Sequence, residues 1–97
     1  MKLCYTPRAI ADLEAIADHL KPLTPRGAQN VRQAILETLQ NLIDFPRIGR
    51  PQTINGVRKL GTRKYPYLVF YTADETAEEI IILSIQHTSR ESEFADL

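Results

Sequence analysis

Prolines set the limits of two helices in the first half of this chain. Each helix is expected to begin with a Thr-Pro pair, whose prolines are Pro7 and Pro25. Threonine caps a first turn well, and proline is tolerated after it because its missing N–H would have no partner there. Pro22 ends the first apolar repeat and Pro46 ends the second. Apolar residues recur at helical spacing between these limits, which predicts two antiparallel helices joined by a short loop.

Four segments outside these helices have the composition of β-strands. A short strand is predicted at residues 2–6, before the first helix. Three more are predicted at residues 56–61, 65–73 and 79–86, which are rich in β-branched and aromatic side chains. The polar residues 74–79 join the last two strands and predict a hairpin.

The order of these elements predicts a fold class. The apolar run from Ile80 to Leu83 lacks a clean alternation, which indicates a central strand covered on both faces for part of its length. A chain of 97 residues that is 43% hydrophobic suits one domain over residues 1–97. The order β-α-α-β-β-β then predicts an α+β fold, with an N-terminal strand and an antiparallel helical hairpin packed on a small, mostly antiparallel curved sheet.

Positive charge is concentrated in the middle of the chain although the formal net charge is zero. The 12 basic and 12 acidic residues argue against a general attraction to nucleic acid or anionic lipid. No acidic residue lies between Phe45 and Ala73. Basic side chains can protect a sheet surface, but a stretch this free of acids also suits contact with an acidic protein segment. The candidates for that contact are Arg47, Arg50, Arg58, Lys59, Arg63 and Lys64.

Several classes of protein are disfavoured by what the chain lacks. Its N-terminus has no apolar signal segment, and no stretch approaches the length of a membrane span, so we expect a cytoplasmic protein with no membrane partner. One cysteine and two histidines give little basis for a disulfide or a zinc site. We expect neither a metal nor a cofactor.

The segment FPRIGRP, residues 45–51, joins the second helix to the later strands. Pro46 is expected to stop the helix, and Phe45 to pack at the junction of helix and sheet. Gly49 is expected to supply the backbone conformation of a sharp turn, and Pro51 to stiffen the exit. The two arginines of the segment have no such structural task, which leaves them as candidates for contact with a partner.

Two sets of side chains have a structural interpretation. The acids Asp12, Glu14 and Asp18 on the first helix are expected to form a solvated face, because they lack a histidine partner. Alternation along the third strand places Tyr67 and Tyr71 on one face and Phe70 on the other. Phe70 is predicted to belong to the core rather than to stack on nucleic-acid bases.

Five segments carry a family resemblance across nearly the whole chain: TPRAIADLEAIADHL, LIDFPRIGRP, GVRKL, YPYLVFY and IIILSIQHTSR. In this order and spacing they resemble the RelE/ParE superfamily of toxins from bacterial type II toxin-antitoxin modules, closer to the ParE branch. The resemblance implies a helical hairpin on a sheet. It also implies a cognate antitoxin, encoded by an adjacent gene, that forms a hetero-oligomer with the toxin and holds it inactive.

Toxins of this superfamily have two different activities. RelE-like toxins cleave mRNA on the ribosome, whereas ParE-like toxins are associated with poisoning DNA gyrase and have no known hydrolytic site. In RNA-cleaving relatives we expect an arginine before the Leu-Val pair of the third strand, and a tyrosine near the C-terminus. Here Tyr67 takes the first position, Thr88 follows His87, and Phe94 of the tail has no hydroxyl group. These departures favour the ParE branch over the RelE branch. The resemblance to that branch implies a growth inhibitor that acts on DNA gyrase and is not itself an enzyme.

Two alternatives remain open from the sequence. One is a ribosome-dependent mRNA endonuclease, since arginine, lysine and histidine together suffice for a weak phosphodiester site. His87 would act there as a general acid or base, although a histidine at a strand end more often caps backbone groups. The other is an inactive toxin fold that persists as a binding module. The candidate catalytic residues of the endonuclease are Arg58, Arg63, His87 and Arg90.

Overall fold

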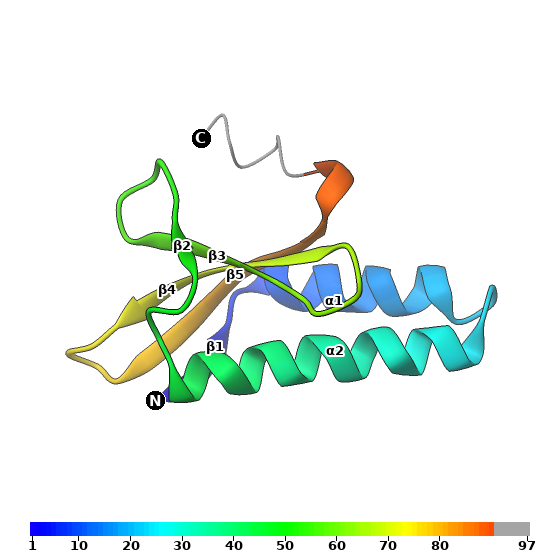
Figure 1. The fold of residues 1–97 in the computed structure, drawn as a ribbon, viewed down its shortest axis with the longest axis horizontal. Coiled ribbons are helices and arrows are strands. Elements are labelled where there is room, and N and C mark those ends of the chain that lie inside the picture. The colour runs from blue at the N-terminus through cyan, green and yellow to red at the C-terminus, as the bar shows by residue number, and fades with distance from the viewer. Residues whose placement is uncertain (91–97) are drawn as a thin grey trace.

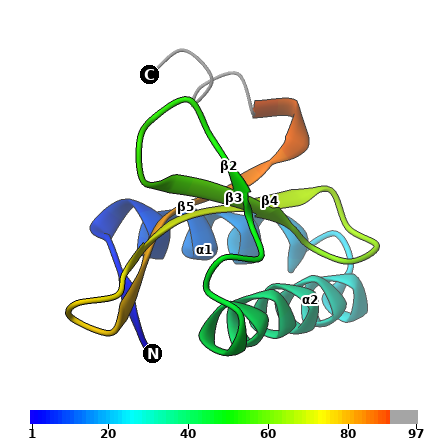
Figure 2. The same ribbon diagram turned by 60° about the vertical axis from the view of Figure 1, so that its left-hand side comes forward.

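The computed structural model describes residues 1–90, with only the backbone described at Arg90. The elements are β1 (Lys2–Tyr5), α1 (Pro7–Leu20), α2 (Pro25–Asp44), β2 (Arg50–Pro51), β3 (Val57–Gly61), β4 (Tyr67–Asp74), β5 (Glu79–His87) and a short 3-10 helix η1 (Thr88–Arg90). The two long helices lie side by side on one face of the sheet (Figures 1 and 2). The predicted α+β fold is confirmed, with one strand, β2, that was not predicted.

The sheet has five strands in the order β1-β5-β4-β3-β2. β1 runs parallel to β5, and the other neighbouring strands are antiparallel. β5 therefore lies inside the sheet, between β1 and β4, as its continuous apolar run predicted. β1 and the two-residue strand β2 form the edges, and β2 pairs only with Arg58 and Lys59 of β3.

Both long helices begin where the Thr-Pro pairs predicted. The Thr6 Oγ1 atom accepts a hydrogen bond of 3.1 Å from the N–H of Ala9, and Thr24 Oγ1 accepts one of 3.1 Å from the N–H of Gly27. Each cap is worth about 1 kcal/mol. α2 ends just before Pro46, whose ring cannot continue the helix.

A β-bulge interrupts the pairing of β4 with β5. Phe70 pairs with Ser84 while Tyr71 pairs with Ile82, so Leu83 is an extra residue on β5. The bulge changes which residues of β5 face the helices, because the helix-facing core contains Ile82 and then Ile85, three positions later. Within the apolar run, Ile80 and Ile82 belong to the helix-facing core, whereas Ile81 and Leu83 are half-buried.

Residues at the start of α1 bind the backbone around this bulge. The Thr6 hydroxyl lies 2.9 Å from the Leu83 carbonyl oxygen and donates to it. Asp12 Oδ2 accepts a hydrogen bond of 2.7 Å from the Ser84 hydroxyl and one of 3.0 Å from the N–H of Ile85. The predicted solvated acidic face is therefore wrong for Asp12, since its carboxylate turns toward β5.

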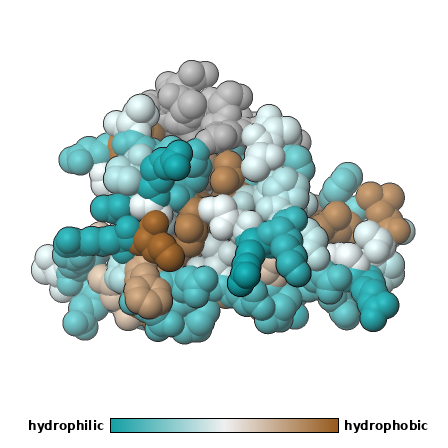
Figure 3. Space-filling view, in the orientation of Figure 1, coloured by the Kyte–Doolittle hydropathy of each residue, from teal (hydrophilic) through white to brown (hydrophobic). Residues whose placement is uncertain are grey.

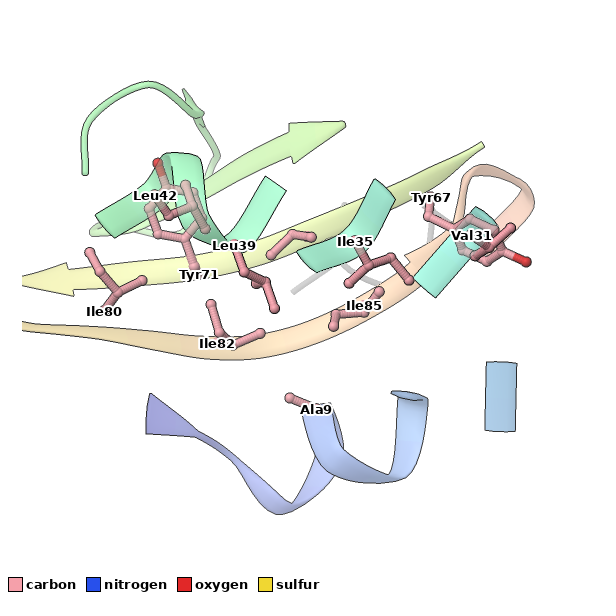
Figure 4. Close-up of a cluster of buried hydrophobic side chains, with 11 residues drawn as sticks. Ala9, Val31, Ile35, Leu39, Leu42, Tyr67, Tyr71, Ile80, Ile82 and Ile85 are labelled. Carbon is pink, nitrogen blue, oxygen red and sulfur yellow. The ribbon is translucent and has the colours of Figure 1, made fainter. Parts of the chain in front are cut away.

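The core lies between the helices and the facing side of β4 and β5 (Figure 4). Tyr67 and Tyr71 of β4 point to this side, as alternation predicted, and Tyr71 is fully buried. Phe70 points to the opposite side of β4 and is also buried, so its predicted place in the protein interior is confirmed. α2 contributes its apolar stripe, which consists of Val31, Ile35, Leu39 and Leu42.

Candidate functional site

Two side chains from the sheet hold the backbone of the connection between α2 and β2. The Tyr71 hydroxyl donates to the Pro46 carbonyl oxygen at 2.8 Å and accepts from the N–H of Gly49 at 2.9 Å. The Arg58 Nη1 atom donates to the carbonyl oxygens of Gly49, at 2.8 Å, and Arg47, at 3.2 Å. The connection is therefore fixed by polar contacts to its own backbone.

Phe45 does not pack at the junction of helix and sheet, contrary to the prediction. Its side chain is 62% exposed. The interior of this corner is occupied by Tyr71 and Leu42, which are both fully buried. The N–H of Ile48 donates to the Phe45 carbonyl oxygen at 3.1 Å, which closes a turn and leaves Ile48 50% exposed as well.

Gly49 is required for a different reason from the one predicted. Among the described residues Gly56 is the glycine with a positive φ, so Gly49 supplies no left-handed conformation. A Cβ atom at Gly49 would instead lie 2.6 Å from the Tyr71 hydroxyl oxygen. The connection also ends in a strand, because Arg50 and Pro51 form β2 and pair with β3.

The arginines of this region differ in what they bind. Arg47 forms a two-pronged ion pair with Glu75 in the β4–β5 hairpin, with Nε–Oε1 at 2.8 Å and Nη2–Oε2 at 2.9 Å. Arg58 pairs with Tyr71 across the β3–β4 ladder, and its guanidinium group donates to the carbonyl oxygens of Gly49 and Arg47. Arg50 is exposed, and its guanidinium group has no hydrogen bond or ion pair within residues 1–90.

The remaining predicted contact residues lie on β3 and in the turn that follows it. Lys59 is half-buried, pairs with Arg50 across the β2–β3 ladder, and points to the face opposite Arg58. Arg63 and Lys64 are exposed in the turn between β3 and β4, where Lys64 has a φ of 71°. The acid-free stretch therefore does not form one continuous basic surface.

His87 lies at the far end of the sheet from Arg58. Its Nδ1 atom accepts a hydrogen bond of 3.1 Å from the N–H of Ser89 and lies 3.0 Å from the Ser89 hydroxyl oxygen. An Nδ1 atom that accepts from a backbone N–H carries no proton, so the ring proton is on Nε2. The ring packs edge-on against Tyr67, with centroids 5.5 Å apart. These contacts match the capping interpretation of His87.

The candidate catalytic residues do not gather at one point. Arg58 pairs with Tyr71 and His87 with Tyr67, which are four residues apart on β4, or about 13 Å along a strand. The turn that holds Arg63 does lie near His87, because the N–H of Thr88 donates to the Pro66 carbonyl oxygen at 2.8 Å. The Arg90 side chain and Phe94 lie outside what the structure describes.

Beside His87, a cleft of about 420 Å³ runs between α1 and the end of β5. Asp12, His19 and Gln86 line it together with Tyr67. Asp12 is held by the β5 bulge, and burial raises the pKa of the Tyr67 hydroxyl above its ordinary value. The cleft thus offers polar groups, but Asp12, the carboxylate that the described residues contribute to it, already accepts hydrogen bonds from Ser84 and Ile85.

A second and more apolar groove, of about 440 Å³, lies between α1 and α2. Leu13, Ile16 and Leu20 of α1 face Val31, Ile35, Leu36 and Leu39 of α2 across it. The charged residues on its wall, Lys21 and Arg32, are both basic. Leu36 is 44% exposed, although its neighbour Ile35 belongs to the core, so this wall of the groove is open to solvent.

Comparison with solved structures places this fold in a class of bacterial toxins. A chain of the chromosomal ParDE toxin-antitoxin system from P. aeruginosa matches with a TM-score of 0.76 and 34% identity, covering 90% of this chain and 95% of that one. The isolated E. coli RelE toxin has the same fold, with a TM-score of 0.69 and 16% identity over 98% of this chain and 92% of that one.

The sequence comparisons identify the family. The family described as ParE toxin of the type II toxin-antitoxin system parDE matches residues 3–92. Toxin RelE2 of Caulobacter vibrioides is 31% identical over 90 residues, which cover 92% of this chain and 97% of that protein. The chain belongs to the ParE toxin family and is a ParE-like toxin of a type II toxin-antitoxin system. Within residues 1–90, neither long helix is apolar enough over a sufficient length to cross a membrane.

Proposed function

We propose that this toxin inhibits growth by binding and poisoning DNA gyrase, without hydrolytic chemistry of its own. Membership of the ParE family over residues 3–92 is the observation that carries the proposal. The site geometry supports it. The position expected to hold a catalytic arginine is taken by Tyr67, whose ring is 8% exposed and part of the core. The Arg58 guanidinium group donates hydrogen bonds to backbone carbonyl oxygens, and it lies far along the sheet from His87.

We further propose that a cognate antitoxin, encoded beside the toxin, occupies the groove between α1 and α2. The groove is apolar at its floor and carries Lys21 and Arg32 on its wall. An amphipathic helix with apolar anchors and acidic flanks fits both features, because its anchors would be buried while its acids approach the two cations. The charges of the groove thus point to an acidic antitoxin segment that folds on binding.

Expression in bacteria without the antitoxin tests the activity. We expect growth arrest with DNA-damage signalling and intact mRNA. Primer extension on cellular mRNA supplies the opposing measurement: new 5′ ends at codon spacing would defeat the gyrase proposal and favour the endonuclease. Growth at the normal rate, with soluble folded protein present, would favour an inactive binding module. Co-expression of the product of the adjacent reading frame is expected to restore growth.

A further inference from the structure

The connection between α2 and β2 exposes two large apolar side chains to solvent. Phe45 is 62% exposed and Ile48 is 50% exposed, and they lie three residues apart on one turn. In the space-filling view an apolar patch lies over this connection, bordered by hydrophilic surface (Figure 3). Single exposed apolar residues are ordinary, but an aromatic and an aliphatic side chain on one fixed turn form the kind of patch that marks an interface.

The turn that carries this pair is fixed before any partner arrives. Tyr71 bridges its two ends through Pro46 and Gly49, and Arg58 binds two of its carbonyl oxygens. Gly49 must approach Tyr71 so closely that a Cβ atom would not fit. A prearranged surface loses little conformational entropy on binding, which raises affinity for a given contact area.

The charges around the pair favour a protein partner over a nucleic acid. Phosphate contacts need free cations, but Arg47 is neutralised by Glu75, and Arg58 is directed at carbonyl oxygens. Arg50 is the nearby cation left for a partner within the described residues. Phenylalanine, isoleucine and one arginine resemble the centre of a protein interface, where aromatic and arginine anchors contribute most of the affinity.

We propose that Phe45, Ile48 and Arg50 form the surface by which this toxin contacts its protein target. They would insert into an apolar pocket of the target that is bordered by an acidic group. This inference rests on the proposed function, because it assigns a surface to the same gyrase-poisoning activity. The turn follows the C-terminal end of α2, whereas the antitoxin groove is lined by α2 residues no later than Leu39. Substitutions can therefore separate the two contacts.

The test compares purified wild-type toxin with two variants in a gyrase supercoiling assay. The first variant combines Phe45→Ser with Ile48→Ser, and the second is Arg50→Glu. Each is expected to need at least about tenfold more protein for half-maximal inhibition, because truncation of an interface anchor has an effect of this size. Leu23→Ser removes an apolar side chain that is 69% exposed in the loop between the helices, and is expected to change the inhibition less than twofold.

Circular dichroism and binding to the antitoxin, the product of the adjacent reading frame, supply the controls. Both variants should fold and bind the antitoxin with affinity within about threefold of wild type. If the double variant fails to fold, the exposed Arg50→Glu variant decides. Inhibition by the folded variants at wild-type concentration overturns the inference while the proposed function stands. An equal loss of antitoxin affinity assigns the turn to the antitoxin and also overturns it. If wild-type toxin arrests growth but leaves gyrase unaffected, the proposed function fails and this inference fails with it.

Discussion

Substitution of Tyr71 by phenylalanine isolates the contact that holds the connection between α2 and β2. The ring is fully buried in the core and would stay there, so the change removes one oxygen atom and no apolar surface. That oxygen donates to the Pro46 carbonyl and accepts from the N–H of Gly49. Both backbone groups would lose their partner, and Gly49 is itself buried.

The expected loss of stability follows from these two contacts. A net hydrogen bond contributes about 1 kcal/mol, and a buried group left without a partner costs about 1–3 kcal/mol. We therefore expect the free energy of unfolding to fall by about 2–3 kcal/mol. For a domain of this size each 1 kcal/mol lowers the melting temperature by about 4–5 °C, so Tyr71→Phe should melt about 10 °C below wild type.

Urea unfolding and thermal melts followed by circular dichroism measure the effect. Tyr65→Phe is the matched control, because the Tyr65 hydroxyl makes no hydrogen bond to another residue in the described part of the chain, and its loss should cost under about 0.5 kcal/mol. A Tyr71→Phe variant as stable as the Tyr65→Phe variant would refute the conclusion that the Tyr71 hydroxyl fixes the connection.

Three further changes test other parts of the structure. Asp12→Ala should lower the free energy of unfolding by about 1.5–3 kcal/mol, because hydrogen bonds from β5 to a carboxylate are lost, whereas Glu14→Ala should have little effect in the same urea titration. Leu36→Asp should weaken antitoxin binding at least tenfold in calorimetry while toxicity persists; unchanged affinity would remove the groove as the antitoxin site. Burial raises the pKa of Tyr67 and Tyr71 above the ordinary 10.0, so the unfolded chain loses these protons at lower pH than the folded protein. Their contribution to the free energy of unfolding is therefore complete below pH 10 and is lost as the pH rises through the folded pKa values. In urea unfolding, the free energy of unfolding should fall less between pH 9 and pH 11 for the Tyr71→Phe variant than for wild type.

Local signals in the sequence were sufficient for most of the fold. The caps at Thr6 and Thr24 act within three residues, so residue type alone predicted both helix starts. Alternation likewise placed Phe70 and Tyr71 on opposite faces of one strand. The strand β2 escaped prediction because it has two residues, one of them proline, and it exists through its pairing with Arg58 and Lys59.

The candidate site depended on contacts that are distant in sequence. Glu75 pairs with Arg47 from the β4–β5 hairpin, and nothing local marks it as that arginine's partner. Tyr71 looked like any core aromatic residue, although its hydroxyl determines why residue 49 must be glycine. The exposure of Phe45 was missed because an apolar residue at a helix end usually packs inward, and here Tyr71 already fills that space.

The most direct test of the central claim is a cleavage assay with purified gyrase, ATP and supercoiled plasmid. The toxin should convert plasmid to a linear, gyrase-linked form in proportion to its concentration, and preincubation with the antitoxin should prevent the conversion. The same preparation should leave mRNA on translating ribosomes intact. An intact, normally supercoiled plasmid together with mRNA cut at codon spacing would contradict the account.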